Sequence, residues 1–135
     1  MRRQVWYVTV LVGVMCAVRF GLAAYGYALP DDLMTQLGMS PSLNSQAPYL
    51  VRVWAIRDIV LAVLVLQAGP ETIRALLYAC IVVDATDVLS AHLSGLRGLF
   101  SASDVWALKA TAIAALIPET LALGLILVRR SRNKV

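Results

Sequence analysis

Four apolar runs of membrane length dominate this chain and limit what it can fold into. They cover residues about 5–29, 49–67, 72–93 and 104–128. Each run is close to or longer than the roughly 20 residues that an α-helix needs to cross the hydrocarbon core of a bilayer. Because the runs and their short connections use nearly all of the 135 residues, we predict a single all-α domain over residues 1–135, an integral membrane four-helix bundle. The 60% hydrophobic content and the mean hydropathy of +0.76 agree with this class.

The charges that flank the runs predict the orientation of the helices. The first loop, PDDLMTQLGMSPSLNSQAP, carries two acidic residues and no basic one. Basic residues precede the first run and follow the last, at Arg2, Arg3, Arg129, Arg130, Arg132 and Lys134. Since positively charged flanks stay in the cytoplasm, we expect both termini there and, in a bacterium, the inner membrane as the location. The net charge of +4 then reflects topology, and without stacking motifs beside the basic residues we expect no nucleic-acid partner.

Local signals indicate where the helices begin, end and touch. Pro30 ends the first run, Pro48 occupies a helix-starting position, and the stretch SASD, 101–104, is typical of an N-terminal cap. The short connection AGPE makes the second and third runs antiparallel neighbours. We expect the first run to be kept as a helix, because it is too long for a signal peptide and contains Arg19. Small residues spaced by four predict close helix packing on one face of that run, at Gly13, Ala17 and Gly21.

Charged residues interrupt the apolar runs, and their depths agree. At about 1.5 Å of rise per residue, Arg57 and Asp58 lie about 12–14 Å below the outer end of the second run, near the middle of the membrane. Asp84 and Asp87 lie about 18 and 22 Å along the third run, which starts from the inner side. Arg19 lies about 20 Å along the first run. Because an unpaired charge in the bilayer costs several kcal/mol, we expect these side chains to pair, with Arg57 contacting Asp84 or Asp87.

Two interpretations of these charges stay open. A salt-bridge network that only fixes helix register explains Arg52, Lys109 and His92, whose side chains lie near helix ends and can reach water. It explains the aspartates less well, because carboxylates are short and apolar residues meet a purely structural need at lower cost. We therefore favour a functional polar pocket in the outer half of the bundle. Glu119, which follows Pro118, receives no assigned role.

Motifs for other chemistries are absent from the sequence. It contains no Ser–His–Asp motif, phosphate-binding loop or CxxC pair, and no metal-ligand spacing. Cys16 and Cys80 fall near mid-membrane, where we expect them to pack as small apolar side chains. We accordingly expect no metal and no cofactor.

Three stretches of the chain resemble a family of small four-helix membrane proteins that is described mostly as a domain of unknown function. They are RFGLAAYGYALP at the end of the first run, YLVRVWAIRD at the start of the second, and DATDVL in the third. The resemblance covers nearly the whole chain, through short motifs. Some fungal proteins of similar size and span number are associated with epoxide opening in polyketide pathways, so the resemblance implies epoxide chemistry.

The intramembrane aspartates suit such chemistry. Opening an epoxide needs a base that activates water or a hydroxyl and an acid that protonates the leaving oxygen. Soluble limonene-epoxide hydrolases are similar in this respect, with an Asp–Arg–Asp arrangement on an unrelated fold. The catalytic residues that the resemblance implies here are Asp58, Asp84, Asp87 and Arg57. The substrate-binding candidates around them are Arg19, Tyr25, Tyr49, Arg52 and Trp54.

We expect an integral membrane enzyme that opens or rearranges a lipophilic small molecule, with epoxide hydrolase or cyclase activity as the specific hypothesis. A proton-coupled small-molecule carrier is one alternative, because membrane carboxylates bind protons, although the arginines oppose a cation site and no repeat halves are visible. A non-catalytic membrane subunit is the other, and it requires the polar groups to be packed and dry. The expected partners are a lipophilic substrate and membrane lipid, and the sequence leaves a homo-oligomer open.

Overall fold

The computed structural model describes residues 2–40 and 45–132. Over this part of the chain the structure is all-helical, as predicted, with five helices and no strand. The helices are α1 (Arg2–Ala28), α2 (Pro30–Gln36), α3 (Ala47–Gln67), α4 (Ile73–Leu96) and α5 (Ala102–Arg132). Residues 41–44 of the predicted outer loop and Lys134 of the predicted basic C-terminus lie outside the described residues.

Three of the described helices are long and apolar enough to cross a membrane, namely α1 over Trp6–Ala28, α4 and α5. The remaining long helix, α3, has 21 residues, but it carries Arg52, Arg57 and Asp58 within this length. Length and composition therefore do not confirm the predicted count of four spans. The predicted boundaries agree with the four long helices to within a few residues, and α2 adds a short helix in the first loop.

The helix ends follow from local backbone chemistry. Proline has no N–H to donate and fits the first turn of a helix, and Pro30 and Pro48 lie in the first turns of α2 and α3. The backbone N–H of Asp104 donates to Ser101 Oγ at 3.2 Å, which caps α5 as the SASD stretch predicts. Because these signals act within a few residues, the sequence alone locates the helices.

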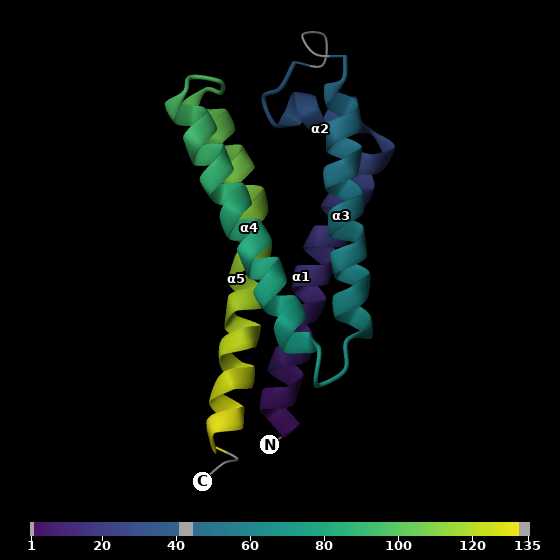
Figure 1. The fold of residues 1–135 in the computed structure, drawn as a ribbon, viewed down its shortest axis with the longest axis vertical. Coiled ribbons are helices and arrows are strands. Elements are labelled where there is room, and N and C mark those ends of the chain that lie inside the picture. Colours follow the sequence, from purple (N-terminus) through teal and green to yellow (C-terminus); the bar gives the residue numbers. More distant parts are fainter. Residues whose placement is uncertain (1, 41–44, 133–135) are drawn as a thin grey trace.

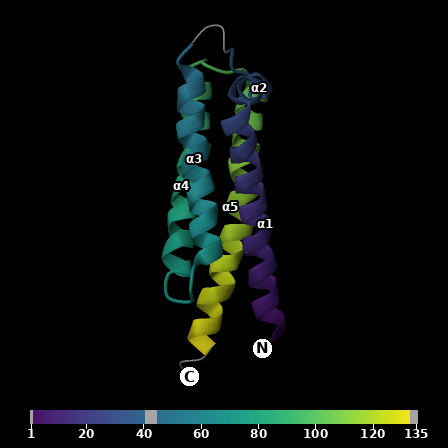
Figure 2. The same cartoon turned by 90° about the vertical axis from the view of Figure 1, so that its right-hand side faces the viewer.

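The four long helices all run along the length of the bundle (Figure 2). α1 packs along α3 and α5, and α4 packs along α5. α3 and α4 are joined by a short turn and run antiparallel, as predicted, but they touch little and diverge away from that turn (Figure 1). The two ends of the chain lie at one end of the bundle and α2 lies at the other (Figure 1).

The apolar core fills the half of the bundle that is nearer to the chain ends. Its buried side chains come from α1, α3, α4 and α5 and are Met15, Cys16, Ala62, Val65, Leu77, Cys80, Ala115, Ala122 and Leu123. Both cysteines are free and buried, in keeping with their predicted packing role. The other half of the bundle, towards α2, contains a cavity.

The predicted packing of small residues along α1 is wrong for contacts within the chain. Gly13, Ala17 and Gly21 are exposed, and a Cβ placed on either glycine would meet no atom of the described residues within 4 Å. The buried face of α1 carries side chains two positions further along, about 200° around the helix, at Met15, Arg19 and Ala23.

Candidate functional site

Arg19 lies at the centre of a buried charge cluster. Its Nη1 donates to Asp58 Oδ1 at 2.9 Å, and its Nη2 donates to Asp84 Oδ2 at 2.7 Å. A longer contact of 3.5 Å joins Nη2 to Glu119 Oε2. The Arg19 side chain is 1% exposed, and its three carboxyl partners are 9% exposed or less. One guanidinium from α1 thereby holds carboxyl groups from α3, α4 and α5.

Arg57 makes a second bridge at the edge of the cluster. Its Nε donates to Asp58 Oδ1 at 3.1 Å, and its Nη2 donates to Asp87 Oδ2 at 2.8 Å. The predicted contact between Arg57 and an α4 aspartate is therefore present, and it is made to Asp87. The side chains of this pair are 37% and 34% exposed, far more than the groups around Arg19.

The two bridges share Asp58 and form one chain of alternating carboxyl and guanidinium groups. It begins and ends on α4, in the order Asp84, Arg19, Asp58, Arg57 and Asp87. Asp84 and Asp87 are three residues apart and so project from one side of α4. Hydrogen bonds in which the donor or the acceptor is ionised are the stronger kind, so this chain ties α1, α3 and α4 together at a single level.

Helix periodicity explains why neighbouring residues of α3 take different positions. The buried stripe of α3 comprises Ala55, Asp58, Ala62 and Val65, spaced as one helical face requires. The small alanines on either side of Asp58 permit the close approach of α1. Arg57 precedes Asp58 by about 100° of rotation, which moves its side chain to the edge of the stripe, next to α4.

Glu119 is the functional candidate that the sequence left without a role. Its side chain is fully buried, and it follows Pro118 inside α5. Its Oε1 has no hydrogen-bond partner among the described residues, and neither has Arg19 Nε. Buried polar atoms are seldom left unpaired, so the hydrogen bonding of the charge cluster is incomplete at these two atoms.

The cluster contains more carboxyl groups than guanidinium groups. Two positive charges, from Arg19 and Arg57, face four carboxyl groups, from Asp58, Asp84, Asp87 and Glu119. With every group ionised, the net charge would be +2 − 4 = −2. Uncompensated charge in an apolar interior costs several kcal/mol, so this balance favours bound protons within the cluster.

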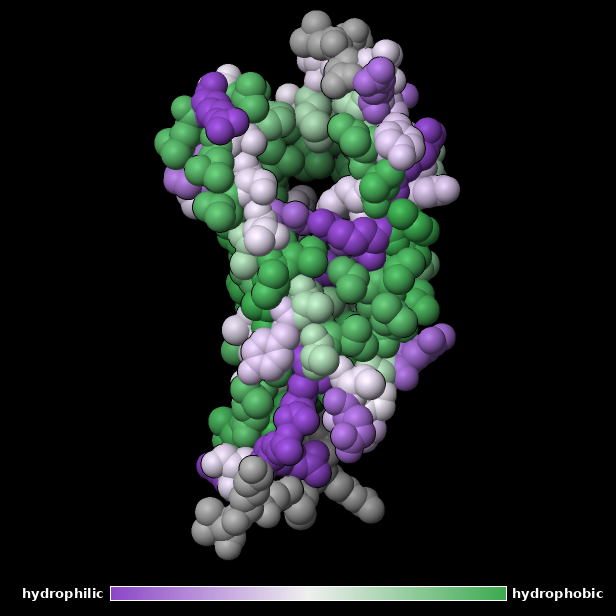
Figure 3. All heavy atoms as spheres, in the orientation of Figure 1, coloured by the Kyte–Doolittle hydropathy of each residue, from purple (hydrophilic) through white to green (hydrophobic). Residues whose placement is uncertain are grey.

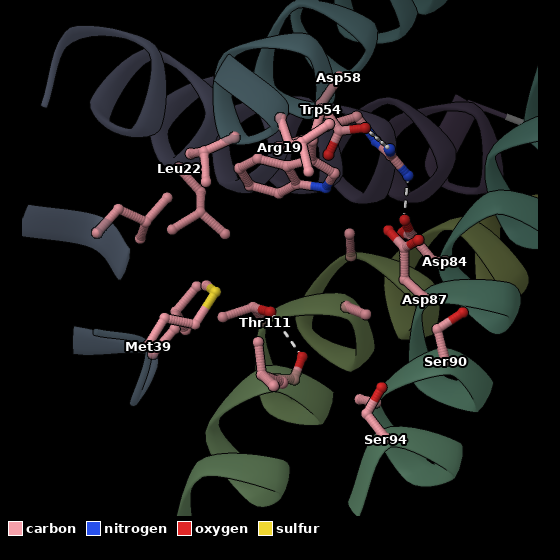
Figure 4. A pocket seen from close by; sticks show the side chains of 18 of the residues that line it. Arg19, Leu22, Met39, Trp54, Asp58, Asp84, Asp87, Ser90, Ser94 and Thr111 are labelled. Atoms are coloured by element: carbon pink, nitrogen blue, oxygen red, sulfur yellow. Dashed lines mark hydrogen bonds and ion pairs between the residues drawn. The ribbon is translucent and has the colours of Figure 1, made fainter. Parts of the chain in front are cut away.

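A cavity of about 330 Å³ lies on the α2 side of the charge cluster. Arg19, Asp58, Asp84 and Asp87 gather at one end of it (Figure 4). The rest of the wall is mainly apolar and includes Leu22, Leu33, Met39, Leu50, Trp54 and Phe100. On the molecular surface the cavity coincides with a hollow that hydrophilic residues border on the side of the chain ends (Figure 3).

Two carboxyl groups at the polar end face the cavity. Asp58 Oδ1 and Asp84 Oδ2 accept hydrogen bonds from Arg19, and both side chains line the cavity. The site thus presents two carboxyl groups that one shared guanidinium holds in place.

The predicted substrate-binding residues divide between the cavity and the surface. Trp54 and Arg19 line the cavity. Tyr25 lies away from it, and its hydroxyl accepts a hydrogen bond from Gln36 Nε2 at 2.7 Å. Arg52 is exposed, with its Nε 3.3 Å from the Tyr27 carbonyl oxygen, and Tyr49 is 68% exposed.

Lys109 and His92 form a separate contact outside the charge cluster. Lys109 Nζ lies 3.3 Å from His92 Nδ1 and 5.6 Å from the centroid of the Trp106 ring. Neither residue lines the cavity, which agrees with their interpretation as side chains near helix ends. In the part of the chain that the structure describes, no group of three His, Cys, Asp or Glu side chains is arranged to hold a metal ion.

Comparison of the chain with protein-family models, with curated proteins and with solved structures finds no match. The functional argument therefore depends on the cavity and the charge cluster themselves.

Proposed function

We propose that the chain is an integral membrane protein with four spans and both termini in the cytoplasm. α3 is the fourth span, because Arg57 and Asp58 are paired inside the bundle and paired charges cost much less in lipid than isolated ones. The even span number agrees with two chain ends on one side (Figure 1). The last turn of α5 carries Arg129, Arg130 and Arg132, as the positive-inside rule requires.

The function that the site supports best is the opening or rearrangement of a lipophilic epoxide. The observation that carries this proposal is the Asp58–Arg19–Asp84 bridge at the end of a mainly apolar cavity. Its volume of about 330 Å³ lies at the lower end of the range for small-molecule sites, roughly 300–1,000 Å³. The bridging arginine is Arg19 in place of Arg57, which was expected in this role.

In the proposed reaction Asp58 is the base and Asp84 is the acid. Asp58 Oδ1 receives hydrogen bonds from two guanidinium groups, which hold the carboxylate in place beside the cavity. Asp58 Oδ2 takes a proton from water as the water oxygen forms a bond to an epoxide carbon. The C–O bond of the epoxide breaks, and Asp84 gives its proton to the departing oxygen, so that a diol is released. If a hydroxyl of the substrate replaces water, the same transfers yield a cyclic ether.

The excess of carboxyl groups supplies the acid in this scheme. The cluster has two more carboxyl groups than guanidinium groups, and we assign protons to Asp84 and Glu119. Asp84 lies against the cavity, where its proton can be used. Glu119 is fully buried with one unpartnered oxygen, and a neutral acid is the form that tolerates such a position best.

The excess of carboxyl groups, which can bind and release protons, also favours a second candidate function, a proton-coupled carrier of a small molecule. A carrier would move its ligand without changing it and would need a proton gradient. Turnover by purified protein in the absence of a gradient distinguishes the enzyme from the carrier. The cavity argues against a purely structural subunit, because such a subunit needs no cavity lined by carboxyl groups.

The proposal is tested with purified protein in lipid nanodiscs and a panel of lipophilic epoxides. Product formation and thermal melting are measured for wild type, Asp58→Asn, Asp84→Asn and the control Asp32→Asn, which alters an exposed residue of α2. Asp84→Asn keeps the shape of the neutral acid, so we expect a folded and inactive protein, while Asp32→Asn stays active. Full activity in folded Asp58→Asn or Asp84→Asn, or no turnover of any epoxide by wild type, contradicts the proposal.

A further inference from the structure

One side of the bundle is open at the level of the cavity. α1 packs on both α3 and α5, and α4 packs on α5, whereas α3 and α4 touch little. These two helices diverge towards the end that carries α2 (Figure 1). The hollow in the molecular surface lies on this face, between α3 and α4 (Figure 3). The open side of the cavity is therefore lateral, perpendicular to the long axis of the bundle.

The end of the cavity that faces α2 is covered. Leu33 of α2 is buried and lines the cavity, and it packs so closely on Gly26 of α1 that a Cβ there would overlap it. After α2 the chain turns at Gly38, with φ +76°, and passes against the Asp104 side chain at the start of α5. The segment from α2 to Met39 thus crosses from α1 to α5 and closes this end of the cavity.

The two helices beside the lateral opening carry exposed apolar side chains. Val53 and Ile56 of α3 and Leu89 and Leu93 of α4 are each between 46% and 53% exposed. Apolar side chains in such numbers on an exposed surface mark a face that contacts lipid or a partner. In a four-span protein, this face lies within the acyl region of the bilayer.

We propose that the cavity receives its ligand sideways from the bilayer, through the opening between α3 and α4. The ligand is an amphiphile dissolved in the membrane, with an apolar body and one small oxygen-bearing group. The proposal rests on the proposed function for the chemistry of that group, an epoxide. The route itself depends on the fold, on the covered α2 end and on the exposed apolar side chains of α3 and α4.

The Arg57–Asp87 ion pair is the polar element of this route. It joins α3 to α4 at 2.8 Å, and about a third of each side chain is exposed. Asp87 also lines the cavity, so the pair stands between the opening and the buried Arg19 bridge. A ligand that enters with its oxygen-bearing end first can exchange hydrogen bonds with this pair, which turns that end towards Asp58 and Asp84.

Trp54 provides a direct readout of ligand access. It lines the cavity, and the other two tryptophans, Trp6 and Trp106, are 61% and 67% exposed and can be replaced by Phe. The variant with both of these replacements is placed in nanodiscs, and the fluorescence of its single tryptophan, Trp54, is measured with two quenchers. One is a long-chain dibromo-alcohol dissolved in the lipid, and the other is iodide in the aqueous phase.

We expect the dibromo-alcohol to quench Trp54 several-fold more strongly than iodide. Ser90 is an exposed α4 residue on the cavity wall, and Ser90→Phe should reduce the lipid-phase quenching several-fold. The matched control is Leu89→Phe, at an exposed α4 position beside Ser90 that does not line the cavity, and it should leave the quenching unchanged.

Strong iodide quenching with weak dibromo-alcohol quenching overturns the lateral route in favour of an aqueous one. Equal effects of Ser90→Phe and Leu89→Phe also overturn it. If Ser90→Phe does not fold, the comparison of the two quenchers in the unblocked protein still decides the question. Quenching requires no turnover, so a protein that admits the dibromo-alcohol but opens no epoxide refutes the proposed reaction and leaves the lateral route standing.

Discussion

Replacement of Arg19 by leucine should be the most damaging single change in the charge cluster. Its guanidinium holds Asp58 and Asp84 at 2.9 and 2.7 Å with a side chain that is 1% exposed. Removing one partner of a buried ion pair costs about 3–5 kcal/mol, because the remaining charge is left without compensation. We expect a loss of this size in the free energy of unfolding for Arg19→Leu, reduced to the extent that the stranded carboxylates take up protons.

Arg57→Leu is the matched comparison, since Arg57 also bridges two aspartates. Its side chain is 37% exposed and that of Asp87 is 34% exposed, and Asp87 lines the cavity. Water in the cavity can hydrate the carboxylate that is left behind, so the loss should be smaller than for Arg19→Leu. Arg19→Lys should recover only part of the loss, because one ammonium cannot reproduce the planar fork that binds two carboxylates.

Unfolding by a denaturing detergent in mixed micelles, followed by far-ultraviolet circular dichroism, measures these differences. A double-mutant cycle with Asp84→Leu isolates the coupling between Arg19 and Asp84. The reasoning is refuted if Arg19→Leu and Arg57→Leu are equally stable, or if Arg19→Lys is as stable as wild type.

Three further predictions concern the acid, the cavity wall and the topology. The free energy of unfolding of Glu119→Gln should lie within about 1 kcal/mol of the wild-type value, because the amide resembles the neutral acid and strands no buried charge. The infrared carbonyl band of a protonated carboxyl should weaken in this variant. A large destabilisation with an unchanged band contradicts the proton assigned to Glu119. Trp54→Ala should raise KM for lipophilic epoxides more than it lowers kcat, because Trp54 lines the apolar wall of the cavity. Steady-state kinetics measures both constants, with Trp106→Ala, at an exposed position, as the control. Reporter fusions after residue 135 and within 31–47 should place the C-terminus in the cytoplasm and the loop outside, and an external C-terminus rules out the proposed topology.

The positions of the long helices could be predicted from the sequence because their signals are local. Long apolar runs and proline at the first turns of α2 and α3 need only a few residues to act. The cap at Ser101 acts within three residues. The depth of each charged residue along its helix was also predictable, because the rise per residue is constant. This count placed Arg57 and Asp87 at similar levels.

The rotation of the helices and the choice of their neighbours were not predictable in the same way. The short turn between α3 and α4 suggested close packing, yet α3 packs on α1, where Ala55 and Ala62 leave room around Asp58. This packing makes Arg19 the buried bridge and leaves Arg57 at the edge. Tyr25 and Tyr49, which we expected to bind the substrate, lie outside the cavity wall.

Glu119 was missed because depth was counted from backbone positions. Side chains on a helix tilt towards its N-terminus, so the long Arg19 side chain extends along α1 towards the end that carries the chain termini. This brings its Nη2 to 3.5 Å from Glu119 Oε2. A fourth carboxylate inside an apolar run was the available signal, and counting charges over the whole bundle would have identified it.

The central claim, that Asp58 and Asp84 open an epoxide by proton transfer to and from water, is tested most directly by isotope labelling. Excess purified protein in nanodiscs is mixed with a lipophilic epoxide in ¹⁸O-water without any gradient, and the product of the first turnover is analysed by mass spectrometry. The account predicts a diol that carries ¹⁸O from the first turnover, and none from Asp84→Asn. An unlabelled first-turnover diol, which an ester with an aspartate would give, or the absence of any diol from wild type, would contradict it.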